Sequence, residues 1–309
     1  MNYNRIMAGA GSIHFEECYN GNFIGVDFGI KKDLTKDLGD NFKQFSKKYR
    51  PIYLKLFPNK SKVAAGLACG SIWTASYDLK IGDIILCPDG KGQYMVGEIS
   101  SNYHYEPNAI LPHRRKINWF KKPILRTDMS KELQNSSGSV LTCCNLNKYK
   151  DEIDLLIEGE KTNPLTSSDP TIEDASEFAL EKHLEHFLIK NWNKTALGKK
   201  YNIYEVDGDL VGQQYPSDTG PIDILAISKN KKELLVVELK KGRVSDSVLG
   251  QIQRYMGYVK EELAEDNQKV KGVIIGLEDD IKIQRALSVT DNIDFYRYQI
   301  NFKLYKSKH

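Results

Sequence analysis

The sequence has 309 residues, of which 40% are apolar, and it carries a net charge of +3. This length allows two domains with separate cores, and the small net charge alone does not identify a partner. No apolar run approaches the roughly 20 residues that span a bilayer, and the N-terminus lacks a signal-peptide pattern, so we expect a cytoplasmic protein without a membrane partner. The five cysteines form no zinc-type spacing and are predicted to be reduced structural thiols.

The first half of the chain is predicted to be mostly β, with two helices. β-branched and aromatic residues bounded by Gly, Pro, Asn and Asp predict strands within 22–30, 82–100 and 116–120. The DGKG turn at 89–92 predicts that the middle segment is a hairpin. Helices are predicted over 37–57 and 59–76. Together these elements indicate a compact α+β, barrel-like domain.

A change of composition marks the expected domain boundary. Residues 158–177, EGEKTNPLTSSDPTIEDASE, combine prolines, a Ser/Thr cluster and scattered acids without apolar periodicity. We therefore predict a recognition domain over 1–157, a linker over 158–176 and a second domain over 177–309.

The second half is predicted to be α/β. Apolar residues at helical spacing predict an opening helix over 174–192. Strands at 222–228 and 233–240, a helix over 245–264 and a strand at 271–277 follow. The alternating aromatic segment 293–306 predicts a last strand.

Two acids stand next to the apolar strands of this half. If 222–228 and 233–240 pair as a hairpin, Asp223 near the start of one strand lies beside Glu238 near the end of the other. Converging carboxylates repel each other unless a cation such as Mg²⁺ lies between them, and Lys240 points to the same face as Glu238. This combination is typical of phosphodiester hydrolysis. The alternative is a solvated ion pair at the strand ends.

Two helices carry further candidates. Gln251 and Tyr255 are four residues apart, hence on one helical face, where they could hold a water or a phosphate. Glu181 and Glu185 are stacked in the same way, and either could supply a third carboxylate. The alternative is that Tyr255 packs in the core and the glutamates face water. For Glu185 we adopt that alternative.

These residues resemble the PD-(D/E)XK nuclease superfamily. The resemblance covers about 177–306 and lies in a helical Glu (Glu181), GPID (Asp223), ELK (Glu238 and Lys240) and the QxxxY helix (Gln251 and Tyr255). It implies an αβββαβ core and Mg²⁺-dependent cleavage, with Mn²⁺ as a possible substitute. Glu181, Asp223 and Glu238 would be metal ligands, while Lys240 acts on the water and Gln251 supports it. Pro221 is followed by Ile222, so the literal PD pair is absent.

Aromatic and basic residues are interspersed in the first half. Such a mixture suits phosphates and stacked bases, and a base flipped out of a duplex is read between aromatic rings. The alternative is that the aromatics fill a small β core and the basic run is a solvated turn. The candidate nucleic-acid-binding residues are Trp73, Thr74, Tyr77, Tyr103, Tyr105, His113, Arg114, Arg115 and Trp119, together with Tyr255 of the second half.

A second resemblance concerns about 45–125. The pattern GDIILCPDGKGQYMVGEI…YHYEP…HRRKINW is similar to the EVE and PUA-like family of modified-base readers. This resemblance implies a β-barrel that flips a base into an aromatic pocket, in some members a modified cytosine. By position, Trp73, Thr74 and Tyr103 would line that pocket.

A reader joined to a nuclease predicts a modification-dependent restriction endonuclease that acts on double-stranded DNA. Two alternatives stay open: a sequence- or structure-specific endonuclease without modification dependence, and a non-catalytic DNA-binding protein. Because one such site cleaves one strand at a time, a double-strand break favours a homodimer.

Overall fold

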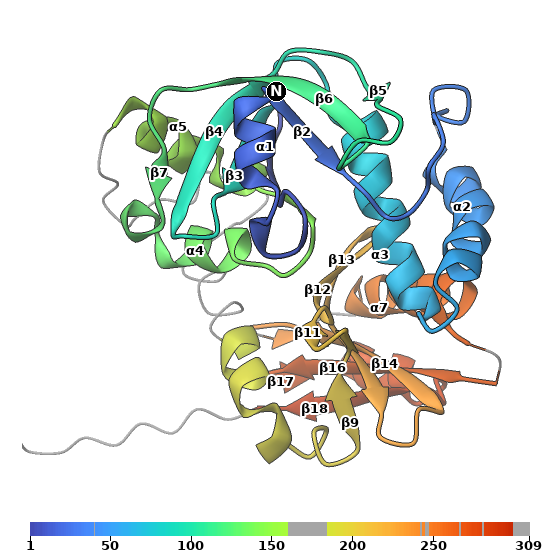
Figure 1. The fold of residues 1–309 in the computed structure, drawn as a ribbon. Coiled ribbons are helices and arrows are strands. Elements are labelled where there is room, and N and C mark those ends of the chain that lie inside the picture. Colours follow the sequence, from blue (N-terminus) through green and yellow to red (C-terminus); the bar gives the residue numbers. More distant parts are fainter. Residues whose placement is uncertain are drawn as a thin grey trace, which may run out of the picture. The chain divides into compact units, whose positions relative to one another are not determined.

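A computed structural model describes residues 1–39, 41–159, 184–241, 243–244, 247–265, 267–279 and 281–298 (Figure 1). The chain divides into two compact units, Met1–Thr171 and Ile172–His309. The predicted linker lies almost wholly outside the described residues, so its bounds remain a prediction.

The N-terminal unit contains a mixed β-sheet and several helices. The predicted hairpin is confirmed as β3 (Ile84–Pro88) and β4 (Gln93–Ile99), and the two predicted helices are found as α2 (Phe42–Leu56) and α3 (Lys62–Trp73). The elements are β1 (Tyr3–Ile6), α1 (Phe15–Asn20), β2 (Phe23–Val26), α2 (Phe42–Leu56), α3 (Lys62–Trp73), β3 (Ile84–Pro88), β4 (Gln93–Ile99), β5 (His104–Tyr105), β6 (His113–Trp119), β7 (Ile124–Leu125), α4 (Lys131–Ser137), β8 (Cys143–Asn145) and α5 (Lys150–Glu158).

The main path of this sheet runs β2-β6-β4-β3-β1-β8, with β5 paired to β6 and β7 to β4. β1 and β3 are parallel, whereas β3–β4 and β2–β6 are antiparallel. Within the described residues no pairing joins the end strands β2 and β8, so the predicted barrel is not found as a closed sheet.

The central strands are buried on both faces, which explains their continuous apolar runs. Along β3, Ile85 and Cys87 pack into one core, whereas Ile84 and Leu86 pack into another on the opposite face. The strand period of two produces this separation. The first core is covered by α2 and α3, and the second by α4 and α5.

The five cysteines are free and not exposed. Burial raises the pKa of the Cys18, Cys69 and Cys143 thiols to about 12, so these groups are protonated at neutral pH. The prediction of reduced structural thiols is therefore consistent with the structure.

The C-terminal unit is built on a sheet of order β12-β13-β14-β16-β18, with β9 also paired to β13. The two predicted strands, the helix and the next strand are found as β13, β14, α7 and β16. Residues 184–191 are helical. They are followed by β9 (Tyr201–Ile203), β10 (Glu205–Val206), β11 (Asp209–Leu210), β12 (Gln213–Ser217), β13 (Gly220–Ser228), β14 (Glu233–Leu239), β15 (Arg243–Val244), α7 (Ser247–Tyr258), β16 (Lys269–Gly276), β17 (Glu278–Asp279), α8 (Ile281–Leu287) and β18 (Ile293–Arg297).

Helix α7 packs closely against β16. A Cβ added at Gly272 would lie 2.6 Å from the Met256 sulfur and 3.0 Å from Ile252 Cδ1, so the absence of a side chain permits this approach. The contact places one face of α7 over the strands that carry the predicted acids. No helix in the described ranges is long and apolar enough to cross a membrane.

Candidate functional site

The hairpin of β13 and β14 brings the two predicted acids together. Ile224 is paired with Val237 in an antiparallel register, which places Asp223 opposite Glu238 when it is continued by one residue. Opposite residues of an antiparallel pair point to the same face. The Leu239 backbone N–H also donates to Asp223 Oδ2 at 2.8 Å, so the side chain reaches across to the neighbouring strand.

The Glu238 carboxylate is buried beside a lysine. Glu238 is 2% exposed, and Lys240 Nζ lies 2.9 Å from its Oε1 atom. A buried charge requires a partner, and the half-buried ammonium group supplies one. The alternative of a solvated ion pair at the strand ends is therefore wrong for Glu238.

Gln251 and Tyr255 meet on one face of α7, as their spacing predicts. Gln251 Nε2 donates to the Tyr255 hydroxyl at 3.3 Å, and the tyrosine ring is buried. Burial is the main reason why the pKa of Tyr255 is raised, and the Glu238 and Asp223 carboxylates raise it further. The buried ring agrees with the alternative that Tyr255 packs in the core. Its hydroxyl nevertheless lies close enough to Asp223 and Glu238 to feel their charges.

Gly220 of β13 allows the Tyr255 hydroxyl to lie close to the strand backbone. Gly220 has φ of 125°, and a Cβ built on it would be 3.1 Å from the Tyr255 hydroxyl oxygen. A side chain at this position would be strained and would crowd the hydroxyl. The glycine of the GPID segment thus has a structural role at the site.

Glu185 requires a correction. Although we expected it to face water, it is 8% exposed. Gln213 Nε2 donates to its Oε1 at 2.5 Å, and Gln214 Nε2 donates to its Oε2 at 2.7 Å. The same Gln214 nitrogen donates to Asp223 Oδ1 at 3.1 Å. Glu181, which we predicted as the third carboxylate, lies outside the described residues.

The sequence contained no usable signal for this amide pair. Gln213 and Gln214 belong to β12, a strand that we did not predict because its residues, QQYPS, lack alternating apolar character. The burial of Glu185 depends on that strand. A helical spacing of four identifies Glu185 as the neighbour of Glu181, but it cannot tell whether Glu185 is buried.

The donor set fits a small, hard cation. Mg²⁺ is held by one or two carboxylates and keeps several waters, and Asp223 and Glu238 are two hard oxygen donors on one face. Across the described ranges, no three His, Cys, Asp or Glu side chains gather in an arrangement suited to a metal. Among the described residues, Asp223 and Glu238 are the two carboxylates that would hold such a cation, with water completing its coordination.

Several predicted reader residues of the N-terminal unit pack in its core. Trp73 is 6% exposed, and its ring centroid lies 5.2 Å from that of Phe45 and 4.4 Å from that of Tyr77. Thr74 continues the helical segment after Trp73, and Trp119 is half-buried beside Tyr19. For Trp73, the alternative that the aromatics fill a core is the one found.

His113, Tyr103 and Tyr105 form a second internal group. His113 is fully buried, with Nε2 2.8 Å from the Ile30 carbonyl oxygen and Nδ1 3.0 Å from the Tyr103 hydroxyl. The carbonyl contact makes Nε2 the protonated nitrogen of a neutral ring. Burial lowers the pKa of His113, which also favours the neutral form. Tyr105 packs beside the same imidazole.

The two predicted phosphate-binding arginines hold the protein's own backbone. Arg115 is 4% exposed, and its guanidinium donates to the carbonyls of Ala75, Ser76 and Ser101. Arg114 stacks over the Phe23 ring at 3.8 Å and donates to the carbonyls of Ile110 and Leu111. The prediction that Arg115 contacts phosphate is therefore corrected, because a buried guanidinium is not available to DNA.

We expect Arg115→Ala to destabilise the N-terminal unit. Burial lowers the pKa of Arg115 to about 10, so the side chain is still charged at neutral pH. Its removal leaves buried carbonyls without their donor, at a cost of about 1–3 kcal/mol for each unsatisfied group. Thermal unfolding should show a clear fall in the midpoint. Arg114→Ala is the matched control, with a smaller fall. Normal stability of Arg115→Ala combined with weakened DNA binding would contradict this assignment.

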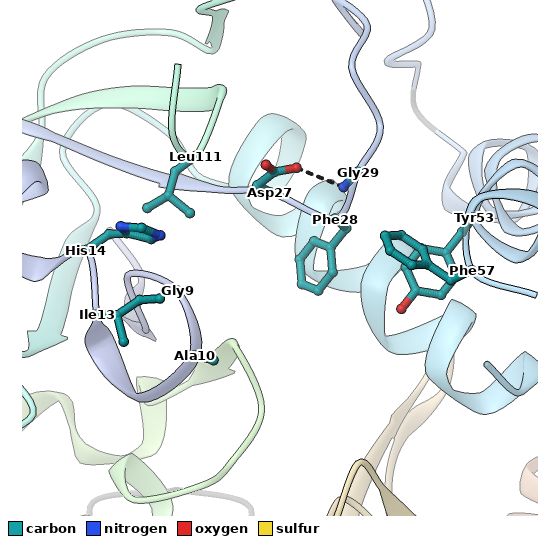
Figure 2. Close-up of a pocket in the computed structure, with 10 residues that line it drawn as sticks. All are labelled: Gly9, Ala10, Ile13, His14, Asp27, Phe28, Gly29, Tyr53, Phe57 and Leu111. Atoms are coloured by element: carbon teal, nitrogen blue, oxygen red, sulfur yellow. Dashed lines mark hydrogen bonds between the residues drawn. The ribbon is translucent and has the colours of Figure 1, made fainter. Parts of the chain in front are cut away.

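The N-terminal unit contains an open cavity of about 420 Å³ whose lining includes none of the predicted reader residues. Figure 2 shows the Phe28 ring between His14, Ile13 and Leu111 on one side and Tyr53 and Phe57 on the other. Asp27 lies at the rim, where its Oδ1 accepts from the Gly29 N–H at 2.8 Å. The lining residues are Gly9, Ala10, Ile13, His14, Asp27, Phe28, Gly29, Tyr53, Phe57 and Leu111.

Unusual backbone conformations shape the cavity walls. Gly9 and Gly29 have φ of 77° and 75°, and the non-glycine Leu111 has φ of 45°. A Cβ at Gly9 would lie 2.7 Å from the His14 ring, and one at Gly29 would lie 2.9 Å from the Phe57 ring. The two glycines therefore allow rings to form the walls. Of Gly9, Gly29 and Leu111, only Leu111 is in a strained conformation, and such strain often accompanies a functional site.

Family models match both halves of the chain. Residues 6–147 match a domain of unknown function, DUF8426, and residues 173–303 match the endonuclease NucS C-terminal domain. Endonuclease NucS of Methanocaldococcus jannaschii is 30% identical over 87 residues, which are 28% of this chain and 32% of that protein. The chain thus matches about a third of the length of this curated relative.

Two solved structures also align with part of the chain. A repair endonuclease from Pyrococcus abyssi has 13% identity and a TM-score of 0.31, with 69% of this chain and 66% of that chain covered. An EndoMS–dsDNA complex has 10% identity and a TM-score of 0.33, with 68% and 62% covered. From residue 173 to 303, the chain is similar to the C-terminal domain of endonuclease NucS.

Proposed function

We propose that this protein is a divalent-metal-dependent DNA endonuclease of the PD-(D/E)XK type. The observation that carries the proposal is the convergence of Asp223, Glu238 and Lys240 on one face of the β13–β14 hairpin. Helix α7 adds Gln251 and Tyr255 near the same carboxylates. The match of residues 173–303 to a nuclease domain supports the same chemistry.

Each residue has a role that follows from its surroundings. Asp223 and Glu238 would hold Mg²⁺, or Mn²⁺ in its place, and the cation would supply Lewis acidity and lower the pKa of a bound water. Lys240 Nζ, 2.9 Å from Glu238, can orient that water or neutralise charge developing on the phosphate. Gln251 and the protonated Tyr255 hydroxyl can hold the water or a phosphate oxygen by hydrogen bonds.

We further propose that the N-terminal unit reads a modified base, with the Figure 2 cavity as the reading site in place of the residues first predicted. A volume of about 420 Å³ is in the range of small-ligand sites. Phe28 and Phe57 offer rings on which a flipped base can stack, and Asp27 and His14 offer polar groups for its edge. A modified cytosine is the base that the EVE-like resemblance implies.

Helix α2 is the proposed source of phosphate contacts near this cavity. Its sequence, FKQFSKKYRPIYLKL, contains no acidic residue and ends beside Tyr53 and Phe57. Lys43, Lys47 and Lys55 are exposed, whereas the exposed Lys48 pairs with the Asp37 carboxylate. Lysines on one element supply affinity without sequence information, which suits a reader whose specificity lies in a pocket.

A second candidate is a structure-specific endonuclease without modification dependence, acting as a monomer or a homodimer. The match to NucS favours it, because that match concerns the nuclease half alone and implies nothing about modified bases.

One digestion separates these functions. The full chain is incubated with Mg²⁺ and with plain, cytosine-modified, mismatched or branched duplexes of equal length. We expect cleavage of the modified duplex only, and none after chelation of the metal. Equal cutting of plain and modified DNA would contradict the reader, preference for branched or mismatched DNA would favour the second candidate, and no cutting of any substrate would contradict both.

A further inference from the structure

Three neighbouring strands place an amide beside the proposed metal ligands. Gln213 is paired with Ile224 and Tyr215 with Ile222, so Gln214 lies opposite Asp223 in the register of β12 and β13. The register of β13 and β14 in turn places Asp223 opposite Glu238. An amide and two carboxylates thus follow one another across the sheet.

The amide of Gln214 links two carboxylates with a single nitrogen. An NH₂ group has two hydrogens, and Nε2 directs one to Glu185 Oε2 at 2.7 Å and the other to Asp223 Oδ1 at 3.1 Å. Gln213 holds the other oxygen of Glu185 at 2.5 Å. A hydroxyl or a carboxylate at position 214 could not donate two bonds.

These contacts determine how the Asp223 carboxylate is oriented. Its Oδ1 accepts from Gln214, and its Oδ2 accepts from the Leu239 N–H at 2.8 Å. A carboxylate oxygen can accept more than one bond, so both oxygens are oriented while they can still coordinate a cation. Hydrogen bonds of this kind to ligating carboxylates strengthen metal binding.

The backbone of Gln214 is in an unfavourable conformation. Its φ is 49°, in the left-handed region that glycine and asparagine adopt far more readily than glutamine. The position therefore holds a long amide where local conformation favours a smaller residue. Such an outlier points to a role for the side chain itself.

We propose that Gln214 is a positioning residue, anchored on Glu185, that preorganises the Asp223 carboxylate for a divalent cation. This inference rests on the proposed metal-dependent function and extends it to residues outside the ELK and QxxxY motifs. It also assigns Glu185 a function through Gln214, without requiring Glu185 to touch the cation.

Two substitutions separate this role from folding. Gln214→Gly removes the side chain but relaxes the left-handed backbone, so the stability lost when the buried Glu185 carboxylate loses a donor is partly offset and the midpoint of thermal unfolding should change little. Gln214→Asn keeps an amide that tolerates this backbone, but it is one methylene shorter and cannot span both carboxylates. Gln213→Asn is the matched control, because the Gln213 amide donates to the other oxygen of Glu185.

The test is calorimetric titration of the full chain with Mn²⁺, together with the Mg²⁺ dependence of DNA cleavage. We expect both Gln214 variants to bind Mn²⁺ about 10–100-fold more weakly than the wild type, with a smaller effect for Gln213→Asn. Cleavage by the Gln214 variants should recover at high Mg²⁺, which Asp223→Ala should not do.

The outcomes distinguish this inference from the function on which it rests. Wild-type Mn²⁺ affinity in both Gln214 variants would overturn the positioning role alone. Weak binding that high Mg²⁺ does not rescue, together with a lowered unfolding midpoint, would assign Gln214 to the fold and overturn it too. A wild-type chain that binds no Mn²⁺ would overturn the proposed function and this inference together.

Discussion

Asp223→Asn is expected to abolish DNA cleavage and leave DNA binding intact. Asparagine has nearly the same shape, but it removes one of the two charges that would hold the cation and places either an NH₂ or an uncharged oxygen toward Gln214. Loss of the cation removes several kcal/mol of transition-state stabilisation, and each 1.36 kcal/mol is tenfold in rate, so we expect a fall of about 1,000-fold or more. Single-turnover cleavage in Mg²⁺ measures it.

The hairpin offers a matched control for this prediction. Glu233 is an acid on β14, near Lys271 and at the opposite end of the strand from Glu238. Glu233→Gln should therefore cut DNA at the wild-type rate, whereas Glu238→Gln should behave like Asp223→Asn. Wild-type cleavage by Asp223→Asn in Mg²⁺ would mean that the active site is elsewhere.

Substitutions in the cavity are expected to remove discrimination between modified and plain DNA. Phe28→Ala or Phe57→Ala would delete a stacking surface, and a base–aromatic stack contributes about 1–3 kcal/mol, or roughly 5- to 150-fold in affinity. Phe57 is 37% exposed, so its truncation should have little effect on folding. Binding to plain DNA, which depends on lysines, should change little.

The measurement uses the non-cleaving Asp223→Asn chain as background. Paired duplexes that differ in one modified cytosine are titrated at two salt concentrations. Tyr19→Ala is the control, because Tyr19 is a partly exposed aromatic of the same unit that does not line the cavity. If the cavity variants keep the wild-type preference, the base is not read there. Equal loss of both affinities would assign the rings to folding or to general DNA contact.

The β13–β14 hairpin shows which parts of the candidate site a local sequence pattern can predict. Apolar runs with a short turn predict two paired strands, and the pairing brings Asp223 opposite Glu238. Lys240 could be placed on the face of Glu238 because residues two apart in a strand point to the same side. For Gln251 and Tyr255 the helical spacing is equally local, and the predicted contact is present. These parts of the candidate site depend on neighbours in sequence.

Other parts depended on residues that are distant in sequence. Arg115 looks like a phosphate-binding residue in the run HRRK, but the carbonyls of Ala75 and Ser76, about 40 residues earlier, take up its guanidinium. Trp73 likewise packs on aromatics of α2. Charge and aromaticity describe what a side chain can do, whereas burial decides whether a ligand can reach it.

The sequence by itself determined the division into two halves, the β3–β4 and β13–β14 hairpins, helices α2, α3 and α7 and the chemical types at the candidate metal site, whereas short elements such as β1, β8 and β12 were not predicted. These features arise from apolar periodicity, turn residues and strand alternation, which act over a few residues. Only the tertiary structure decided that Glu185 is buried and linked to Asp223 through Gln214, and that a ring-lined cavity joins loops around residues 9, 28, 57 and 111. Their physical cause is packing between distant segments, which no local pattern encodes.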